Sequence, residues 1–226
     1  TEGLVGSEMC IRDRLEAALV ASVDHGPQAP AIAAARMTVS CGNSLNHAMA
    51  SAVNMLGDVH GGAGEQCLEM MQKVKGLLDQ GGRLEESVSE EIANHRQTKG
   101  KYIPGFGHRF HKPEDPRAPR LMKLVSDAEG EKLVSGNFMR IGLEIQMQLS
   151  QGKSTGIAMN IDGATAVIFG ELGFAPPLAR GLFCLSRSVG ILAHAWEQKN
   201  QGGRNKGPTP PEFLWNYSGK NPLTEG

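Results

Sequence analysis

Apolar residues recur at helical spacing along most of this 226-residue chain. In one stretch, for example, Leu68, Met71, Val74 and Leu78 fall on one face of a helix. Alternation of apolar and polar residues, which would indicate strands, is nowhere sustained, and turns containing Gly or Pro separate the periodic runs. We therefore predict an all-α fold, with a buried helix after a turn at residues 160–163 and further helices over residues 15–23, 30–40, 44–56, 65–78, 84–97, 120–128, 131–149 and 178–200.

The first fourteen residues, TEGLVGSEMCIRDR, are set apart from this pattern. They have neither the charged-then-apolar order nor the cleavage site of a signal peptide. Because the stretch GSEMCIRDR resembles translated sequencing-adapter readthrough, we expect residues 1–14 to be a non-native leader and exclude them from the fold prediction. We also expect the native N-terminus to be missing.

Composition and charge exclude several classes of function. Apolar residues make up 40% and charged residues 21% of the chain, and the formal net charge is −1. No global field would therefore draw the protein to nucleic acid or to an anionic membrane. No apolar run approaches the about 20 residues of a membrane span. Four scattered cysteines without metal-binding spacing indicate a reduced, cytoplasmic protein. Any anion site must be built locally, from a few arginines.

A glycine-rich turn, DVHGGAGE, carries the first candidate residue for chemistry. His60 stands directly before Gly61 and Gly62, and glycines let a backbone approach a ligand closely. The alternative is a plain turn between two helices in which the histidine is exposed.

A second candidate is the loop-like segment GKYIPGFGHRFHKPEDPRAP, residues 100–119. His108 follows a Gly-x-Gly turn, and four basic residues come within the next nine positions: Arg109, His111, Lys112 and Arg117. A rigid loop of this kind suits a polyanionic substrate, although a solvated basic loop would have the same composition. Zinc is a further alternative because His108 and His111 lie three positions apart. No third ligand is evident, so we predict no metal.

The third candidate is Asp162 in MNIDGATAVIF. A carboxyl group among apolar residues should have either a raised pKa or a partner, which is the profile of a catalytic base. Alternatively, Asn160 or Asp162 caps the apolar helix that follows, and capping and catalysis can coexist. The histidines outside these segments are expected to be surface or hydrogen-bonded packing residues: His47, His95 and His194.

Five segments follow one another along the chain: VDHG (23–26), VHGGAGE (59–65), PGFGHRFHKPEDPR (104–117), NIDG (160–163) and LSRSVGILAH (185–194). Their order and spacing resemble those of the citrate synthase superfamily. The resemblance implies an all-α fold with a large and a small domain, an active site in the cleft between them, and a homodimer. The large domain would comprise residues 15–61 and 176–226, truncated at its N-terminus, and the small domain residues 62–175.

The same resemblance implies a division of catalytic roles. Asp162 corresponds to the family's base, which removes or returns a proton at the methyl carbon of acetyl-CoA. His60 corresponds to the histidine that hydrogen-bonds the thioester oxygen as it becomes an enol or enolate. That role favours a neutral imidazole whose tautomer is fixed by a backbone group. His108 corresponds to the histidine that polarises the keto oxygen of oxaloacetate.

Substrate contacts follow from the same correspondence. His25 would lie on the oxaloacetate side of the site, and Arg117 and Arg187 would clamp the carboxylates. Arginine rather than lysine is expected there because a guanidinium pairs with a carboxylate through two hydrogen bonds. Contacts to the CoA moiety would come from the 104–117 segment, through Lys112, Arg109, Gly105 and Gly107.

Departures from the citrate synthase pattern favour a citryl-CoA lyase, similar to the lyase module of ATP-citrate lyase. Gly26 replaces an acidic residue, and Gly163 follows the base. GRNKGPTPPEF replaces an Arg-Pro element whose arginine reaches the partner subunit, which leaves Arg204 as a candidate substitute. The implied reaction is cleavage of citryl-CoA to acetyl-CoA and oxaloacetate. The alternatives are a citrate or 2-methylcitrate synthase, and a non-catalytic helical dimer or inactive fragment.

Overall fold

The computed structural model describes residues 2–108, 111, 113–205 and 212. These residues form nine helices and no β-strand, apart from two isolated bridges, which confirms the all-α prediction. In chain order the helices are α1 (Glu2–Ala21), α2 (Pro30–Ser40), α3 (Leu45–Val53), α4 (Ala63–Asp79), α5 (Leu84–Thr98), α6 (Arg117–Gly130), α7 (Asn137–Ser150), α8 (Ile161–Glu171) and α9 (Pro176–Asn200).

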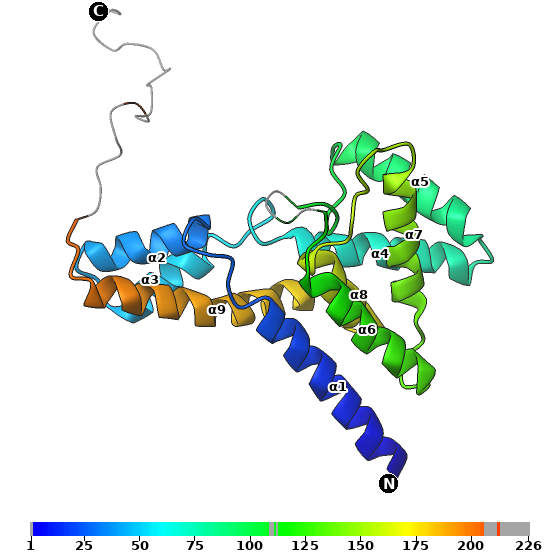
Figure 1. The fold of residues 1–226 in the computed structure, drawn as a ribbon, viewed down its shortest axis with the longest axis horizontal. Helices are drawn as coiled ribbons and strands as arrows, with labels where there is room; N and C mark the ends of the chain where they lie inside the picture. The colour runs from blue at the N-terminus through cyan, green and yellow to red at the C-terminus, as the bar shows by residue number, and fades with distance from the viewer. Residues whose placement is uncertain (1, 109–110, 112, 206–211, 213–226) are drawn as a thin grey trace, which may run out of the picture.

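Helix α9 joins two groups of helices (Figure 1). Helices α2 and α3 pack on each other and on the C-terminal part of α9, around a small cluster of buried apolar residues. Alanines dominate that cluster, so the three backbones approach closely, with Ala35 and Ala48 fully buried beside Ile32 and Ile191. Helices α4 to α8 surround a larger cluster, to which α1 contributes Ala18.

Two helix boundaries differ from the sequence-based prediction for identifiable reasons. Helix α7 begins at Asn137 rather than at residue 131, because Glu171 caps it from the end of α8. The Glu171 carboxylate accepts hydrogen bonds from the backbone N–H groups of Gly136, Phe138 and Met139. Helix α6 begins at Arg117, three residues earlier than predicted, and Asp115 accepts a hydrogen bond from the Arg117 amide.

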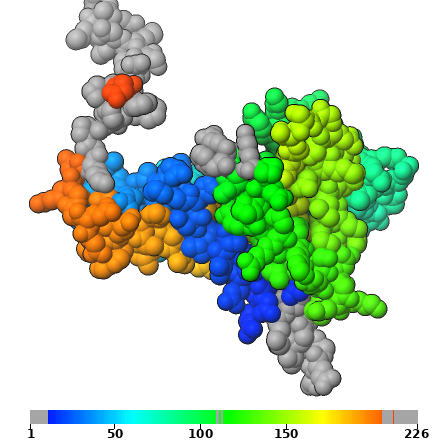
Figure 2. All heavy atoms as spheres, viewed as in Figure 1, coloured from blue at the N-terminus to red at the C-terminus, as the bar shows by residue number. Residues whose placement is uncertain are grey.

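Helix α1 begins at Glu2, so the backbone is helical through most of the segment that the sequence analysis had set aside. Its C-terminal part lies between the two groups of helices in the space-filling view (Figure 2). Among the helices that the structure describes, none has the combination of length and apolarity that would let it cross a membrane.

Candidate active site

His60 is held by a tight loop between α3 and α4. The Gly57 amide donates a hydrogen bond to the His60 carbonyl oxygen at 2.9 Å, and Gly61 has a φ of +99°. A Cβ atom on Gly62 would lie 2.8 Å from the Asp58 Cα atom. The glycines that follow His60 are therefore needed for the backbone path itself.

The half-buried ring of His60 faces the first turn of α2. The Ala31 amide, which has no partner within its own helix, donates a hydrogen bond to His60 Nε2 at 3.3 Å. Because Nε2 accepts, the neutral ring carries its proton on Nδ1. Burial, and then the charge of Arg187, lowers the pKa of His60. The backbone group that the sequence analysis expected to fix this tautomer is therefore the Ala31 amide.

Asn160, not Asp162, caps helix α8. Its side-chain oxygen accepts hydrogen bonds from the amides of Asp162 and Gly163 at 2.9 and 3.2 Å. Asp162 therefore occupies the first turn of the helix with its carboxylate free of a capping role. Burial raises the pKa of Asp162, and this outweighs the opposing effects of Arg187 and Arg117. A carboxyl group in this state suits the transfer of a proton to and from carbon.

The loop before His108 packs directly on the start of α8. Gly105 accepts a hydrogen bond from the Asn160 amide at 3.0 Å, and Gly107 donates one to the Ala158 carbonyl at 2.7 Å. The Asn160 side chain also donates to the Gly107 carbonyl at 2.7 Å. Gly105 and Gly107 have φ values of +84° and +75°, which favour glycine. One asparagine thus positions both the Asp162 helix and the His108 loop.

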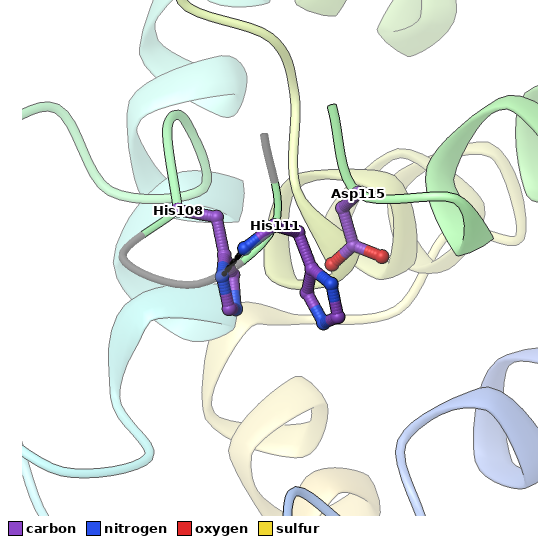
Figure 3. A group of neighbouring side chains, drawn as sticks. All are labelled: His108, His111 and Asp115. Carbon is purple, nitrogen blue, oxygen red and sulfur yellow. Dashed lines mark hydrogen bonds between the residues drawn. The ribbon is translucent and has the colours of Figure 1, made fainter. Parts of the chain in front are cut away.

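His108 is also held as a neutral ring, in the opposite tautomer. The His111 amide donates a hydrogen bond to His108 Nδ1 at 2.9 Å (Figure 3), so the ring proton lies on Nε2. Burial, followed by the neighbouring rings of His111 and His25, lowers the pKa of His108. The ring centroid of His25 lies 5.2 Å from that of His108. His25 and His108 are thus brought together by the fold, although they lie 83 positions apart in the sequence.

Arg117 is fixed by a carboxylate two residues before it. Asp115 is buried, and its two oxygens accept from Arg117 Nε at 2.9 Å and from Arg117 Nη2 at 2.8 Å. The Ile161 amide at the start of α8 donates to the same carboxylate at 3.1 Å. These donors hold the pKa of Asp115 at about 2. Asp115 was not among the residues expected from the sequence, although the EDPR motif places it within hydrogen-bonding range of Arg117.

Arg187 is a buried cation without a carboxylate partner among the described residues. It is 6% exposed; its Nε donates to the Ser22 carbonyl at 3.1 Å, and its guanidinium lies 4.8 Å from the centroid of the Phe183 ring. Burial lowers the pKa of Arg187. The carboxyl groups of Asp162 and Asp24 oppose that effect without contacting the guanidinium, and an anionic ligand would supply a counter-charge in direct contact.

One face of α9 holds the loop that carries His25. Arg187 contacts Ser22, and His194 Nε2 lies 3.2 Å from Asp24 Oδ1. Between them, Gly190 lies so close to the loop that a Cβ atom there would overlap the Val23 carbonyl oxygen. Arg187, Gly190 and His194 therefore lie on one face of α9 that packs against this loop, which explains their spacing in the LSRSVGILAH segment. His194 has the hydrogen-bonded role that the sequence analysis expected.

A metal ion has one candidate site among the described residues. Single ligand atoms of His108, His111 and Asp115 lie within 4.8 Å of one another (Figure 3). Asp115 supplies the third candidate ligand atom, which the sequence did not reveal. However, each of its oxygens already accepts two N–H groups, from Arg117 and Ile161. Coordination would have to displace these donors.

A groove of about 870 Å³ extends from His108 along the ends of α5 and α7. Its walls include the apolar residues Ile103, Phe106 and Ile157. Three cations line it as well: Arg96, Lys101 and Lys153. Neither the groove nor these cations could be recognised from the sequence, because the residues that line the groove lie up to 61 positions apart.

The predicted site residues that the structure describes converge, except for Arg204. Arg187 and Arg117 both influence the pKa values of His25 and Asp162, and Arg187 also influences that of His60. Arg204 lies elsewhere, in a hollow past the end of α9 lined by residues such as Ser40 and Gln198. Arg109 and Lys112 lie outside the described residues.

Comparisons with known proteins agree on one family. The family described as "Citrate synthase, C-terminal domain" matches residues 7–208. A citrate synthase of Acidithiobacillus ferridurans is 30% identical over 166 residues, which is 72% of this chain and 40% of the relative. A citrate synthase of Haloferax volcanii is 30% identical over 189 residues, 83% of this chain and 47% of the relative. The chain thus spans less than half the length of these relatives.

Solved structures with the same fold include both a lyase and synthases. The citryl-CoA lyase from Hydrogenobacter thermophilus matches with a TM-score of 0.77 and 32% identity, over 94% of this chain and 78% of that one. The citrate synthase from Thermotoga maritima matches with a TM-score of 0.70 and 26% identity, over 94% of this chain and 55% of that one.

Proposed function

Because the chain belongs to the citrate synthase family, we propose that it cleaves citryl-CoA to acetyl-CoA and oxaloacetate through an enol or enolate. The observation that carries this proposal is the combination of Asp162, a half-buried carboxyl group with a raised pKa, with His60 and His108 as neutral rings of opposite tautomer. Proton transfer at carbon needs a base such as Asp162. The two substrate oxygens whose charge changes need hydrogen-bond donors such as His60 and His108.

The proposed chemistry is simplest to follow in the condensing direction. Asp162 removes a proton from the methyl carbon of acetyl-CoA, and the thioester oxygen, becoming an enolate, accepts the hydrogen bond of His60 Nδ1–H. The nucleophilic enolate carbon then attacks the keto carbon of oxaloacetate, whose oxygen accepts a hydrogen bond from His108 Nε2–H and takes up a proton from water to become the citryl hydroxyl, while Asp162 releases its proton to water. Cleavage is the reverse: the hydroxyl oxygen beside His108 loses its proton to water as the carbon–carbon bond breaks, and Asp162 returns its proton to the enolate carbon. The raised pKa of Asp162 helps it to hold that proton beforehand.

Two arginines and a groove support the proposed substrates. Arg187 lacks a carboxylate partner among the described residues, and Arg117 is oriented by Asp115, so both can clamp the carboxylates of oxaloacetate, with His25 beside them. The groove beside His108 combines apolar walls with Arg96, Lys101 and Lys153, which suits the pantetheine chain and phosphates of CoA. We retain Lys112, Arg109, Gly105 and Gly107 as proposed CoA contacts.

The lyase direction is proposed over the synthase direction on similarity alone. The Hydrogenobacter citryl-CoA lyase is 32% identical to this chain with a TM-score of 0.77, and the Thermotoga citrate synthase is 26% identical with a TM-score of 0.70. Gly163 is weaker evidence for a lyase than the sequence suggested, since its packing against Gly105 already requires a glycine. A citrate or 2-methylcitrate synthase is the alternative, because it would use the same three residues.

We further propose a homodimer of two-domain subunits, with the domain limits of the sequence analysis, in the cytoplasm. An exposed apolar stripe along α9 supports the dimer, because its spacing of seven, four, three and four residues is that of a helix-packing seam. The stripe comprises Leu178, Leu185, Val189, Leu192 and Trp196. The free cysteines among the described residues, Cys41, Cys67 and Cys184, are consistent with a reducing compartment.

Two assays run in parallel test the proposed function. In one, the chain receives citryl-CoA and release of oxaloacetate is followed by coupled reduction; in the other, it receives acetyl-CoA and oxaloacetate and free thiol is measured. Oxaloacetate release without thiol release is the expected result. Thiol release would instead support the synthase, and a folded chain silent in both assays would contradict the enzymatic proposal and favour the non-catalytic alternative.

A further inference from the structure

The ring of His111 lies among the residues proposed to hold the keto acid, although no role has so far been given to it. Its centroid is 4.4 Å from that of His108 and 6.3 Å from that of His25. One ring nitrogen lies within 4.8 Å of an Asp115 oxygen, and the residue is half-buried (Figure 3). The side chain is therefore directed into the site, not out to solvent.

The surroundings of this ring are rich in donors and poor in free acceptors. His25, His108 and Arg117 all interact electrostatically with one another there, together with His111. Among the residues that the structure describes, Asp115 is the one carboxylate that contributes, and Arg117 and Ile161 already donate four N–H groups to it. A ligand that binds between the rings must consequently bring its own acceptors, as a carboxylate does.

The backbone and the side chain of His111 have separable roles. The backbone amide fixes the tautomer of His108 at 2.9 Å, and any residue other than proline at position 111 can supply that bond. The imidazole is not needed for it. The imidazole ring of His111, whose centroid lies 4.4 Å from that of His108, is therefore available for a different contact.

We infer that His111 is a substrate-binding residue whose ring N–H donates a hydrogen bond to a carboxylate oxygen of the keto acid bound beside His108. The inference rests on the proposed function and extends it, because Arg117 and Arg187 alone were assigned to the carboxylates. A hydrogen bond to a charged acceptor is worth on the order of a 10- to 100-fold change in affinity.

The test measures equilibrium binding, so it does not depend on turnover. Oxaloacetate is titrated calorimetrically into the wild-type chain, His111→Ala, His111→Gln and a control, His47→Ala. His47 is exposed on α3 and contacts Ser44, away from the site. We expect the dissociation constant to rise on the order of 10-fold or more in His111→Ala, less in His111→Gln, which keeps a side-chain donor, and not in His47→Ala. Thermal unfolding and the nitrogen NMR shifts of His108 should be unchanged in all three variants.

The outcomes separate this inference from the proposed function. Equal affinities in the wild-type chain and in His111→Ala, with both folded, would overturn the role of His111 and leave the proposed function standing. Weaker binding together with a changed His108 tautomer would also overturn it, because the side chain would then act through His108. A folded wild-type chain that does not bind oxaloacetate would contradict the proposed function itself.

Discussion

A Cβ atom at position 105 would lie 2.8 Å from the Cα atom of Gly163. Two segments that lie 58 positions apart in the sequence are therefore in backbone contact, with a glycine on each side. Because Asp162 precedes one glycine and His108 follows the other by three residues, this contact sets the distance between two of the proposed catalytic groups. Both glycines are thus part of the site's geometry, though neither has a side chain to contribute.

Gly163→Ala should destabilise the fold and displace Asp162. The added methyl group would overlap the Gly105 carbonyl, and overpacking of this kind costs about 1–3 kcal/mol. Gly76→Ala is the matched control, since it lies inside α4 with open space around it, and should stabilise the helix by up to about 1 kcal/mol. Urea unfolding measures both changes. Equal stability of the two variants would show that the glycine contact is not tight in solution.

Asp162→Asn should be at least as stable as the wild-type chain at pH 7. Burial raises the pKa of Asp162, so its ionisation costs folding free energy above the pKa of the unfolded chain, about 3.9. Asparagine removes that cost. The difference in stability between the variant and the wild-type chain should disappear below about pH 4, where the wild-type carboxyl is neutral in both the folded and the unfolded chain. Thermal unfolding at the two pH values measures it. A variant several degrees less stable at pH 7 would mean that the carboxylate holds the helix, despite the cap supplied by Asn160.

Asp115→Asn should have the opposite effect. Arg117 and the Ile161 amide hold the pKa of Asp115 at about 2, below its unfolded value, so the ionised group stabilises the fold. That contribution, on the order of 2–3 kcal/mol, is present above about pH 5 and is lost as the pH falls toward 2. We expect the variant to unfold at a lower urea concentration than the wild-type chain at pH 7. The difference between the two urea midpoints should become smaller in acid. A gap that is constant with pH would indicate lost packing, not a lost charge.

The sequence predicted the helical fold because helices depend on local patterns, and it named residues that the structure brings together, whose catalytic roles stay predictions. Periodicity placed the helices, and the resemblance pointed to His60, His108 and Asp162. What it could not predict comes from partners far along the chain. The Ala31 amide fixes His60 across 29 positions, and Glu171 sets the start of α7 across more than 30. Arg204, expected only as a substitute for an arginine that reaches the partner subunit, lies away from the site of its own chain, so its role stays a prediction.

The two proposed catalytic histidines should be neutral at pH 7, with their protons on different nitrogens. The Ala31 amide leaves the His60 proton on Nδ1, and the His111 amide leaves the His108 proton on Nε2. Long-range nitrogen–proton NMR spectra of the labelled chain distinguish these tautomers, with His60→Gln and His108→Gln to assign the signals. Two rings in the same tautomer, or a charged imidazolium at pH 7, would contradict this arrangement of the site.

The most direct test of the carbon–carbon chemistry is the fate of one hydrogen. Citryl-CoA is cleaved in deuterated water, and the acetyl-CoA formed is analysed by mass spectrometry, with the wild-type chain and with Asp162→Asn. If Asp162 returns a proton to the enolate carbon, its exchangeable carboxyl group delivers deuterium. The wild-type product should then carry one deuterium in its methyl group, and the folded Asp162→Asn variant should form almost no product. Acetyl-CoA without deuterium, or cleavage by the variant at the wild-type rate, would contradict the account.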